Sequence, residues 1–340
     1  MHTITSATSS RRRHPASVAV LGAATALSLT AGLSACGAGD ADSAAISVDN
    51  CGATINLDAA PGNVTLLKPA SVPTLSALGV LDHVTAKAGQ YPTEYYDQAT
   101  NDALGVIPSL TDKLDASGHL QISSEAVLEN SPDLVIGATD TVSNATMSAT
   151  GTPVVEEPSL CGDLGHPADW NDVADEVKLY GTLFDRADRA EEVATDLQAR
   201  VDELTAAADP AENRSVAVLY PTVGGGPTYA YGSGSMSNAI VNSAGLTNVF
   251  GDQTDRVFEV TAEELADRNP DIIISLYSTG SADAATDEVR DLAAVKNTTA
   301  VTRSHIMPLL LNYADPPTPL AVDGLSKLTD YLKAHPDKEN

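Results

Sequence analysis

The segments SSEAVLENSPDLVIGAT (residues 123–139) and TAEELADRNPDIIISLY (residues 261–277) decide the fold, because they are two versions of one pattern. Each reads Ser or Thr, one residue, Glu, six residues, Pro-Asp, and then a run of branched apolar residues. The first part of the pattern predicts a capped helix, and the apolar run predicts a buried strand. We therefore expect two similar α/β units in one chain.

Short apolar runs alternate with helical patterns on both sides of these segments. A strand is predicted at residues 63–68, a helix at 71–80 and a strand at 83–89. Further strands are predicted at residues 152–158, 215–221 and 304–311. Alternation of this kind favours parallel α/β sheets. Between the two units, the apolar stripe of residues 187–208 predicts a helix of roughly 33 Å, long enough to cross from one lobe to another.

The size and charge of the chain restrict its class. A chain of 340 residues exceeds one ordinary core, so two domains are expected. It has 19 Lys and Arg against 46 Asp and Glu, a formal net charge of −27. Because nucleic-acid binding needs a basic surface, no nucleic-acid partner is predicted.

The N-terminus has the features of an export signal. The basic stretch RRRH (residues 11–14) precedes the apolar run VAVLGAATALSLTAG (18–32), and LSAC (33–36) resembles a bacterial lipobox. Residues 1–35 are thus predicted to be a signal peptide, with Sec and twin-arginine export both open. Cys36 would carry the lipid that anchors the protein to the extracytoplasmic face of the cell membrane, with residues 36–48 as a flexible tether. The alternative is an uncleaved membrane anchor.

The other two cysteines are Cys51 and Cys161. In an exported protein, an even pair is most simply a disulfide. Such a bridge would stabilise the fold by about 4–5 kcal/mol in the chain-entropy model. Two buried free thiols are the alternative.

In their order and spacing, several segments resemble the siderophore- and cobalamin-type substrate-binding lipoproteins of ABC importers. The resemblance runs from Asn50 to Leu332. Besides the two repeated segments, it rests on NCGATINLDAAPGNVTLL, LSALGVLDHV, YGTLFDRADRAEEV and YAYGSGSMSNAIVNSAGLTNVFGD. It implies the class III fold: two Rossmann-like α/β lobes joined by a long rigid helix, with ligand in the cleft between them. The expected parts are an N-terminal lobe (49–165), a helical segment (166–210) and a C-terminal lobe (211–340).

The resemblance also gives the repeated glutamate a role. Glu125 and Glu263 match the residues that, in this family, dock onto arginines of the two permease subunits. A carboxylate–guanidinium pair can be bidentate and fix orientation. The alternative is that acids in a first helical turn offset the helix macrodipole. The spacing of Thr261 and Glu264 is typical of a capping box, which predicts a structural role for Glu264.

Ligand residues are expected beyond the carboxyl ends of the parallel strands. Tyrosines recur at these loops, and each offers a flat apolar face with a hydroxyl, although several could simply cap the core. The predicted ligand-binding residues of the two lobes are Lys68, Gln90, Tyr91, Thr139, Asp140, Tyr220, Tyr229, Tyr231, Arg256, Tyr277 and Tyr313.

The charges near the predicted cleft narrow the ligand. Lys68 and Arg256 are the only plausible cleft cations, whereas a triply negative ferric catecholate would need clustered arginines. A hydroxamate-type ferric siderophore is therefore favoured, with cobalamin, haem or another large cofactor-like ligand as alternatives. A metal-ion receptor is disfavoured because the histidines lack paired ligand spacing; they are His83, His119, His166, His305 and His335.

No enzyme is predicted, and no cofactor. The Gly-rich stretch GGGPTYAYGSGSMS lacks the Gly-Lys-Ser/Thr of a phosphate loop, and it has no Gly-x-Ser-x-Gly elbow. An extracellular hydrolase and an adhesion or structural lipoprotein remain alternatives. The expected partners are the ligand, an ABC permease dimer with its separate ATPase, and the membrane through Cys36, with the binding protein itself a monomer.

Overall fold

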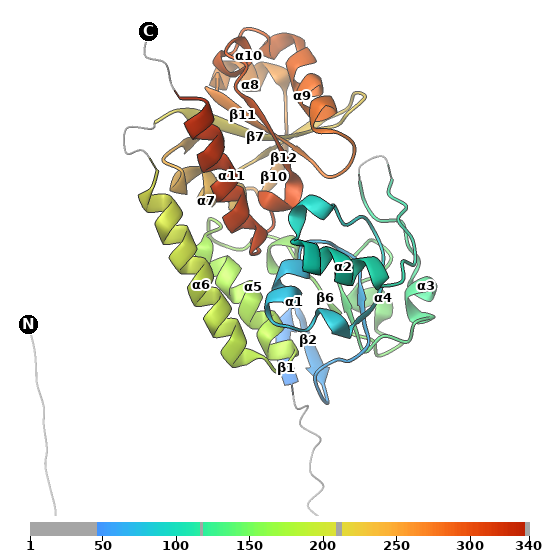
Figure 1. The fold of residues 1–340 in the computed structure, drawn as a ribbon. Helices are drawn as coiled ribbons and strands as arrows, with labels where there is room; N and C mark the ends of the chain where they lie inside the picture. Colours follow the sequence, from blue (N-terminus) through green and yellow to red (C-terminus); the bar gives the residue numbers. More distant parts are fainter. Residues whose placement is uncertain (1–45, 116–117, 209–212, 337–340) are drawn as a thin grey trace, which may run out of the picture. The chain divides into compact units, whose positions relative to one another are not determined.

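The structure is a computed structural model, and it describes residues 46–115, 118–208 and 213–336 (Figure 1). The predicted signal peptide, Cys36 and the tether up to residue 45 lie outside the described residues. Within the described ranges, none of the helices combines the length and the apolar character needed to cross a membrane.

A four-stranded sheet forms the core of the N-terminal half. Its order is β4-β3-β5-β6 and every pairing is parallel. The three residues of β3 and of β5 are all buried, as expected for a sheet that is covered on both faces. The strands are β3 (Val64–Leu66), β4 (Val84–Lys87), β5 (Leu134–Ile136) and β6 (Val154–Val155).

The helices of this half are short, and three of those in the described ranges have a side-chain N-cap. Asp97, Ser123 and Ser143 each accept a hydrogen bond from a backbone N–H of the first helical turn, which satisfies a donor that the helix itself leaves free. The helices are α1 (Val72–Ala77), α2 (Gln98–Val106), α3 (Ser124–Leu128) and α4 (Asn144–Met147).

An antiparallel hairpin precedes this sheet, and it corrects the predicted end of the tether. Residues 46–48 were expected to be flexible, but they lie in β1 (Ile46–Asn50), which pairs with β2 (Ala53–Leu57). Cys51 and Gly52 both have positive φ at the turn. Alternate residues of β2, Ile55 and Leu57, are buried, so burial of this apolar face is what orders the hairpin.

A six-stranded sheet forms the core of the C-terminal half, with the order β10-β8-β7-β11-β12 and β9 beside β7. The predicted parallel arrangement holds for β7, β11 and β12. It is wrong for β8, which runs antiparallel to both of its neighbours, β7 and β10. Only residues 222–227 join β7 to β8, and a loop that short permits a hairpin but no crossover. The strands are β7 (Ser215–Pro221), β8 (Thr228–Tyr231), β9 (Thr247–Asn248), β10 (Val257–Val260), β11 (Ile272–Tyr277) and β12 (Ile306–Leu310).

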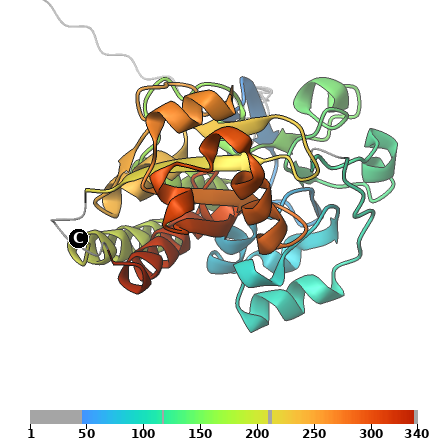
Figure 2. The ribbon, with the colours of Figure 1, turned by 90° about the horizontal axis from the view of Figure 1, so that it is seen from above.

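Helices pack on both sides of this sheet, as the view in Figure 2 shows. The longest, α11, is amphipathic and buries one face that includes Leu325 and Leu328. The helices of this half are α7 (Met236–Ser243), α8 (Ala262–Arg268), α9 (Ala282–Asp291), α10 (Thr299–Thr302) and α11 (Leu320–Ala334).

Two helices connect the halves: α5 (Trp170–Leu183) and α6 (Ala187–Ala206). Ala190 and Val193, near the start of α6, pack into the core of the N-terminal sheet. Val201 and Leu204, near its end, pack into the core of the C-terminal sheet. The helix has 20 residues, a length of about 30 Å. It therefore lies along both cores, beside α5 and α11 (Figure 1).

The sequence repeat corresponds to a repeated structural unit. α3 leads into β5, which lies between β3 and β6, and α8 leads into β11, which lies between β7 and β12. The side chains of Ser123 and Thr261 cap the two helices at the same point. The prediction of two similar α/β units is confirmed.

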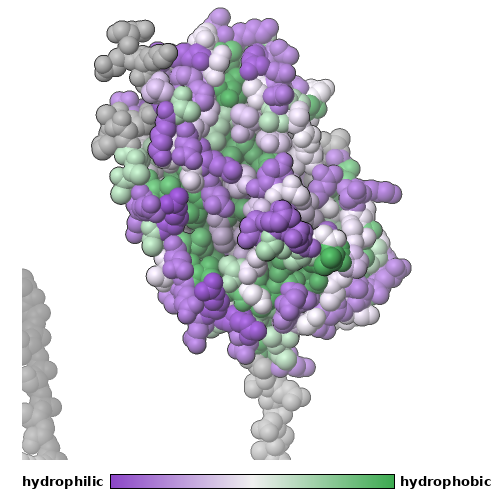
Figure 3. All heavy atoms as spheres, in the orientation of Figure 1, coloured by the Kyte–Doolittle hydropathy of each residue, from purple (hydrophilic) through white to green (hydrophobic). Residues whose placement is uncertain are grey.

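The surface mixes hydrophilic and apolar side chains (Figure 3). On the face shown in Figure 3, hydrophilic side chains are interspersed with smaller apolar patches. With a net charge of −27, the protein repels anionic macromolecules at long range.

Candidate ligand pocket and its charged neighbours

A pocket of about 270 Å³ lies where the two halves meet. This volume is close to the lower end of the range for small-molecule sites, roughly 300–1,000 Å³. One wall is the loop that follows the carboxyl end of β6, and the other is formed around the start of β10. The lining residues are Ser159, Leu160, Gly162, Asp163, Leu164, Gly234, Thr254, Asp255, Arg256 and Val257.

The first wall is held by a covalent and a hydrogen-bonded link. Cys51 and Cys161 form a disulfide, as predicted, and it ties the loop to the β1–β2 turn. Farther along, the backbone N–H of Ala168 donates to the carbonyl of Ser233 at 3.1 Å. The loop is thus fixed to the N-terminal half at one point and to the C-terminal half at another.

The second wall depends on close backbone packing. An added Cβ on Gly232 would lie 2.4 Å from the carbonyl oxygen of Asp255, and one on Gly234 would lie 2.6 Å from that of Thr254. Between them, the Ser233 N–H donates to the Gln253 carbonyl at 2.8 Å. Glycine is therefore required at both positions so that the segment before β10 can pack against residues 232–234.

Among the predicted ligand residues, Arg256 is the one in the pocket lining. Its guanidinium pairs with the carboxylate of Asp315, which is 2% exposed, while the Arg256 side chain is 33% exposed. The Met236 N–H also donates to Asp315, at 3.2 Å. Burial raises the pKa of Asp315, and the charge of Arg256 opposes that shift. Arg256 therefore reaches the pocket with its charge largely compensated.

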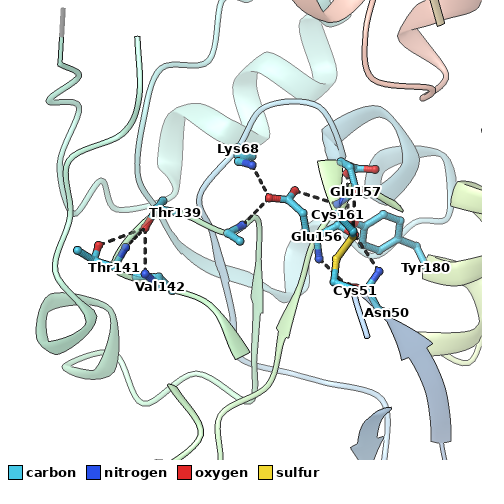
Figure 4. Close-up of polar contacts among 11 residues, drawn as sticks. Asn50, Cys51, Lys68, Thr139, Thr141, Val142, Glu156, Glu157, Cys161 and Tyr180 are labelled. Carbon is cyan, nitrogen blue, oxygen red and sulfur yellow. Dashed lines mark hydrogen bonds and ion pairs between the residues drawn. A yellow bond between two sulfur atoms is a disulfide. The ribbon is translucent and has the colours of Figure 1, made fainter. Parts of the chain in front are cut away.

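The second predicted cation, Lys68, is compensated in the same way (Figure 4). Its ammonium pairs with the carboxylate of Glu156, whose side chain is 8% exposed. Glu156 also accepts hydrogen bonds from the N–H groups of Ala138 and Glu157, at 2.9 and 2.8 Å. The side-chain amide of Asn50, in the hairpin, donates to the Glu156 carbonyl and accepts the Glu156 N–H, both at 2.9 Å.

Two further buried acids lie next to this pair. Glu157 accepts a hydrogen bond from the Tyr180 hydroxyl at 3.1 Å, and Glu176 accepts one from the Thr74 hydroxyl at 2.7 Å. Burial, with the charge of Glu156 second, raises the pKa of Glu157 to about 8. Burial and then the charge of Glu157 raise the pKa of Glu176 well above its ordinary value. These carboxyls therefore favour the neutral form near neutral pH.

Three predicted ligand tyrosines have structural contacts. The Tyr91 hydroxyl donates to the carbonyls of Leu66 and Ala88, both at 3.0 Å. Tyr231 is buried in the C-terminal core. Tyr313 is buried there as well, and its hydroxyl donates to the carbonyl of Glu94.

The other three tyrosines lie on the C-terminal sheet and are partly exposed. Tyr220 and Tyr229 face each other across the β7–β8 pairing, so their side chains share one face of the sheet. The Tyr220 hydroxyl is 3.1 Å from that of Ser278, next to Tyr277 at the end of β11.

The remaining predicted residues lie on the N-terminal half. Gln90 and Asp140 are exposed. The Thr139 hydroxyl accepts the Val142 N–H at 3.1 Å and the Thr141 N–H at 3.4 Å, so it shapes its own turn (Figure 4). None of these three residues lines the pocket described above.

Several residues of the site were not predicted from the sequence. Tyr95 packs into the C-terminal core although it belongs to the N-terminal half. The stretch YPTEYY (residues 91–96) carried a signal for it, since three aromatic residues follow a strand end. Asp315 and the pair Glu156–Glu157 were missed too, although two acids directly after a buried strand are a sign of an internal ion pair.

The two repeated glutamates are exposed, each in the first turn of its helix. Hydrogen bonds from its own backbone N–H and from the Ser123 hydroxyl lower the pKa of Glu125. Glu264 follows Glu263 and lies 3.7 Å from Arg268. The backbone N–H of Glu264 donates to the Thr261 hydroxyl at 3.1 Å, which is the Thr261 half of the predicted capping box.

The histidines are dispersed. Across the described ranges, no group of three or more His, Cys, Asp or Glu side chains is placed to hold a metal ion.

Two α/β sheets, a helix that packs on both of their cores and a pocket where the halves meet define a two-lobed ligand-binding protein. The chain belongs to the periplasmic binding protein family, whose model matches residues 64–309. The resemblance to siderophore- and cobalamin-type binding proteins is thereby confirmed.

Known proteins similar to this chain fall in the same class. An "ABC-type Fe3+-hydroxamate transport system" structure from Saccharomonospora viridis is 44% identical, with a TM-score of 0.80, and the match covers 84% of this chain and 98% of that one. The vitamin B12 binding protein of Vibrio cholerae shares the fold at 19% identity and a TM-score of 0.59, over 82% of this chain and 99% of its own. A cobalamin-binding protein of Halobacterium salinarum is 24% identical over 83% of this chain and 72% of its own length.

Proposed function

We propose that this protein is the extracytoplasmic substrate-binding component of an ABC importer and that it captures a ferric hydroxamate siderophore between its two halves. The observation that carries the proposal is the pocket, which has one wall from the loop after β6 and the other from the segment before β10. A ligand held there contacts both halves at once, so its binding is coupled to their relative position.

The polar groups of the pocket favour a hydroxamate chelate over a strongly anionic one. Of the two predicted cleft cations, only Arg256 lines the pocket, and both Lys68 and Arg256 are paired with buried carboxylates. The pocket therefore offers hydrogen-bond donors without a large positive potential, which suits the oxygen-rich, low-charge surface of a ferric hydroxamate. The 44% identity to a protein described as part of an Fe3+-hydroxamate transport system supports the same ligand class.

For delivery to the transporter, each half offers one exposed glutamate. Glu125 and Glu263 occupy equivalent positions at the starts of α3 and α8, and both are exposed. Each would pair with an arginine of one permease subunit, and a lipid on Cys36 would keep the protein near the permease. The import step itself draws its energy from a separate ATPase.

The binding test uses the fluorescence of Trp170, the one tryptophan of the chain. Its indole N–H donates to the Ser243 hydroxyl at 2.9 Å, which joins the start of α5 to α7 of the C-terminal half. Because α5 is one of the two helices that connect the halves, the fluorescence of Trp170 should respond when a ligand changes how α5 packs. Ferric hydroxamates, cobalamin, haem, Zn²⁺ and Mn²⁺ are titrated in parallel.

Saturable binding of a ferric hydroxamate, recovered chemically unchanged, is expected. Arg256→Ala should weaken that binding, while Arg290→Ala, which removes an exposed arginine of α9, serves as the matched control. Saturation by cobalamin, by haem or by a bare cation alone would overturn the hydroxamate assignment.

A further inference from the structure

Two carboxylates of the pocket lining form no ion pair with a lysine or arginine within the described ranges. Asp163 and Asp255 are exposed and lie on opposite walls. The Asp163 carboxylate accepts the N–H of Gly165 at 2.8 Å, but no ion pair involves either side chain among the described residues. The one cation in the lining, Arg256, is already bound to Asp315.

A third lining residue, Ser159, independently indicates that the pocket binds a ligand. Ser159 is 3% exposed, and within the described part of the chain its hydroxyl has no hydrogen-bond partner. A buried hydroxyl without a partner is costly, and a ligand atom in the pocket would satisfy it. The pocket therefore combines an unsatisfied polar group with a net negative rim.

We infer that the pocket selects its chelate by charge: it prefers a singly cationic ferric chelate, whose protonated amine lies beside Asp163 and Asp255, over a neutral one, and it disfavours an anionic one. This inference rests on the proposed function and deepens it. The physical reason is that an ammonium gains attraction from the two unpaired carboxylates, whereas a carboxylate on the ligand would face them as a like charge.

The test uses three ferric trihydroxamates that share one iron-binding core and differ at one chain end. The first has a free amine and a net charge of +1, the second is acetylated and neutral, and the third is succinylated and carries −1. Affinities are measured by fluorescence and by calorimetry at low and at physiological salt.

The expected order of affinity is cationic, then neutral, then anionic, with about a tenfold difference between the extremes. Added salt should shrink that difference, because the two carboxylates are exposed to solvent. In the double variant Asp163→Asn with Asp255→Asn, the three chelates should bind within about twofold of one another. Asparagine keeps an oxygen that can accept the Gly165 N–H, so the loop contact is retained.

A matched control removes two acids elsewhere. Asp188→Asn with Asp196→Asn changes the net charge by the same amount on the exposed side of α6 and should leave the order of the chelates unchanged. Equal binding of the three chelates to the wild type, or tightest binding of the anionic one, overturns the charge selection alone. Binding of none of them overturns the proposed function and this inference together.

Discussion

Tyr95 and Tyr313 lie edge to face with their ring centroids 5.0 Å apart, and each belongs to a different half of the molecule. Tyr95 ends the 3₁₀ turn η2 (Thr93–Tyr95), and Tyr313 ends η5 (Leu311–Tyr313). The Asn312 N–H donates to the Tyr95 hydroxyl oxygen at 2.9 Å, and the Tyr313 hydroxyl donates to the Glu94 carbonyl. Two reciprocal hydrogen bonds and a ring contact therefore join the halves at this point.

Replacement of Tyr95 should destabilise the whole fold. Tyr95→Ala removes a buried ring from the C-terminal core and should lower the free energy of unfolding by about 3–5 kcal/mol. Tyr95→Phe keeps the ring but leaves the Asn312 N–H without its acceptor, with an expected loss of about 1–3 kcal/mol. Urea denaturation followed by circular dichroism measures both values.

The control for this pair is Tyr331→Phe. The Tyr331 hydroxyl is buried and has no hydrogen-bond partner among the described residues, so its removal should be close to neutral or slightly stabilising. If Tyr95→Phe were as stable as Tyr331→Phe, the hydrogen bond between the halves would contribute nothing measurable.

The free energy of unfolding should fall as pH rises, because Glu157 is buried. Its pKa is about 8 in the folded protein, raised mainly by burial, against an ordinary value of 4.5. Because the folded protein holds this proton more tightly than the unfolded chain, protonated Glu157 stabilises the fold. This contribution is complete below the unfolded pKa of about 4.5 and is lost as pH increases to the folded pKa of about 8. The loss should be on the order of a few kcal/mol.

The variant Glu157→Gln tests this pH dependence. Glutamine stays neutral and still accepts the Tyr180 hydroxyl, so the decrease between pH 5 and 8 should become much shallower. At pH 8 the variant should be the more stable protein. Glu129→Gln, at an exposed position, should leave the slope as it is. An identical slope in wild type and Glu157→Gln would show that Glu157 does not titrate in this range.

Removal of the two repeated glutamates should separate transport from binding. In Glu125→Ala with Glu263→Ala, both exposed carboxylates are lost from the starts of α3 and α8, while the pocket is untouched. Ligand affinity should therefore stay within about twofold, and import by cells that carry the cognate permease should be abolished.

The matched control for this prediction is Glu129→Ala with Asp267→Ala, two exposed acids near the same helices. It should import normally. Normal import by the Glu125/Glu263 variant would instead favour the simpler role of these acids, namely an interaction with the helix macrodipole.

Loss of the disulfide should loosen one wall of the pocket. Cys51→Ser with Cys161→Ser opens a loop of 110 residues and should cost about 4–5 kcal/mol of unfolding free energy in the chain-entropy model. Ligand binding should weaken as well, because residues 159–164 lose their link to the hairpin. Reduced wild-type protein should behave like the double variant, and a thiol count on denatured, unreduced protein should find neither Cys51 nor Cys161 free.

Local patterns in the sequence were enough to predict much of the fold. The paired Ser/Thr, Glu and Pro-Asp signals mark α3–β5 and α8–β11 because caps and apolar runs act over a few neighbouring residues. The stripe of α6 and the strand β7 were predictable for the same reason. Cysteine number and export context pointed to the Cys51–Cys161 bridge without any knowledge of distance.

Which distant side chains meet was set by the tertiary structure. It paired Lys68 with Glu156 and Arg256 with Asp315, placed Tyr95 in the core of the other half, and put residues 159–164 opposite residues 254–257. It also set β8 antiparallel to both of its neighbours, β7 and β10, because only residues 222–227 join β7 to β8. Such contacts join segments far apart in the chain, so their energy depends on the packed arrangement of both sheets and leaves no periodic signal in either segment alone.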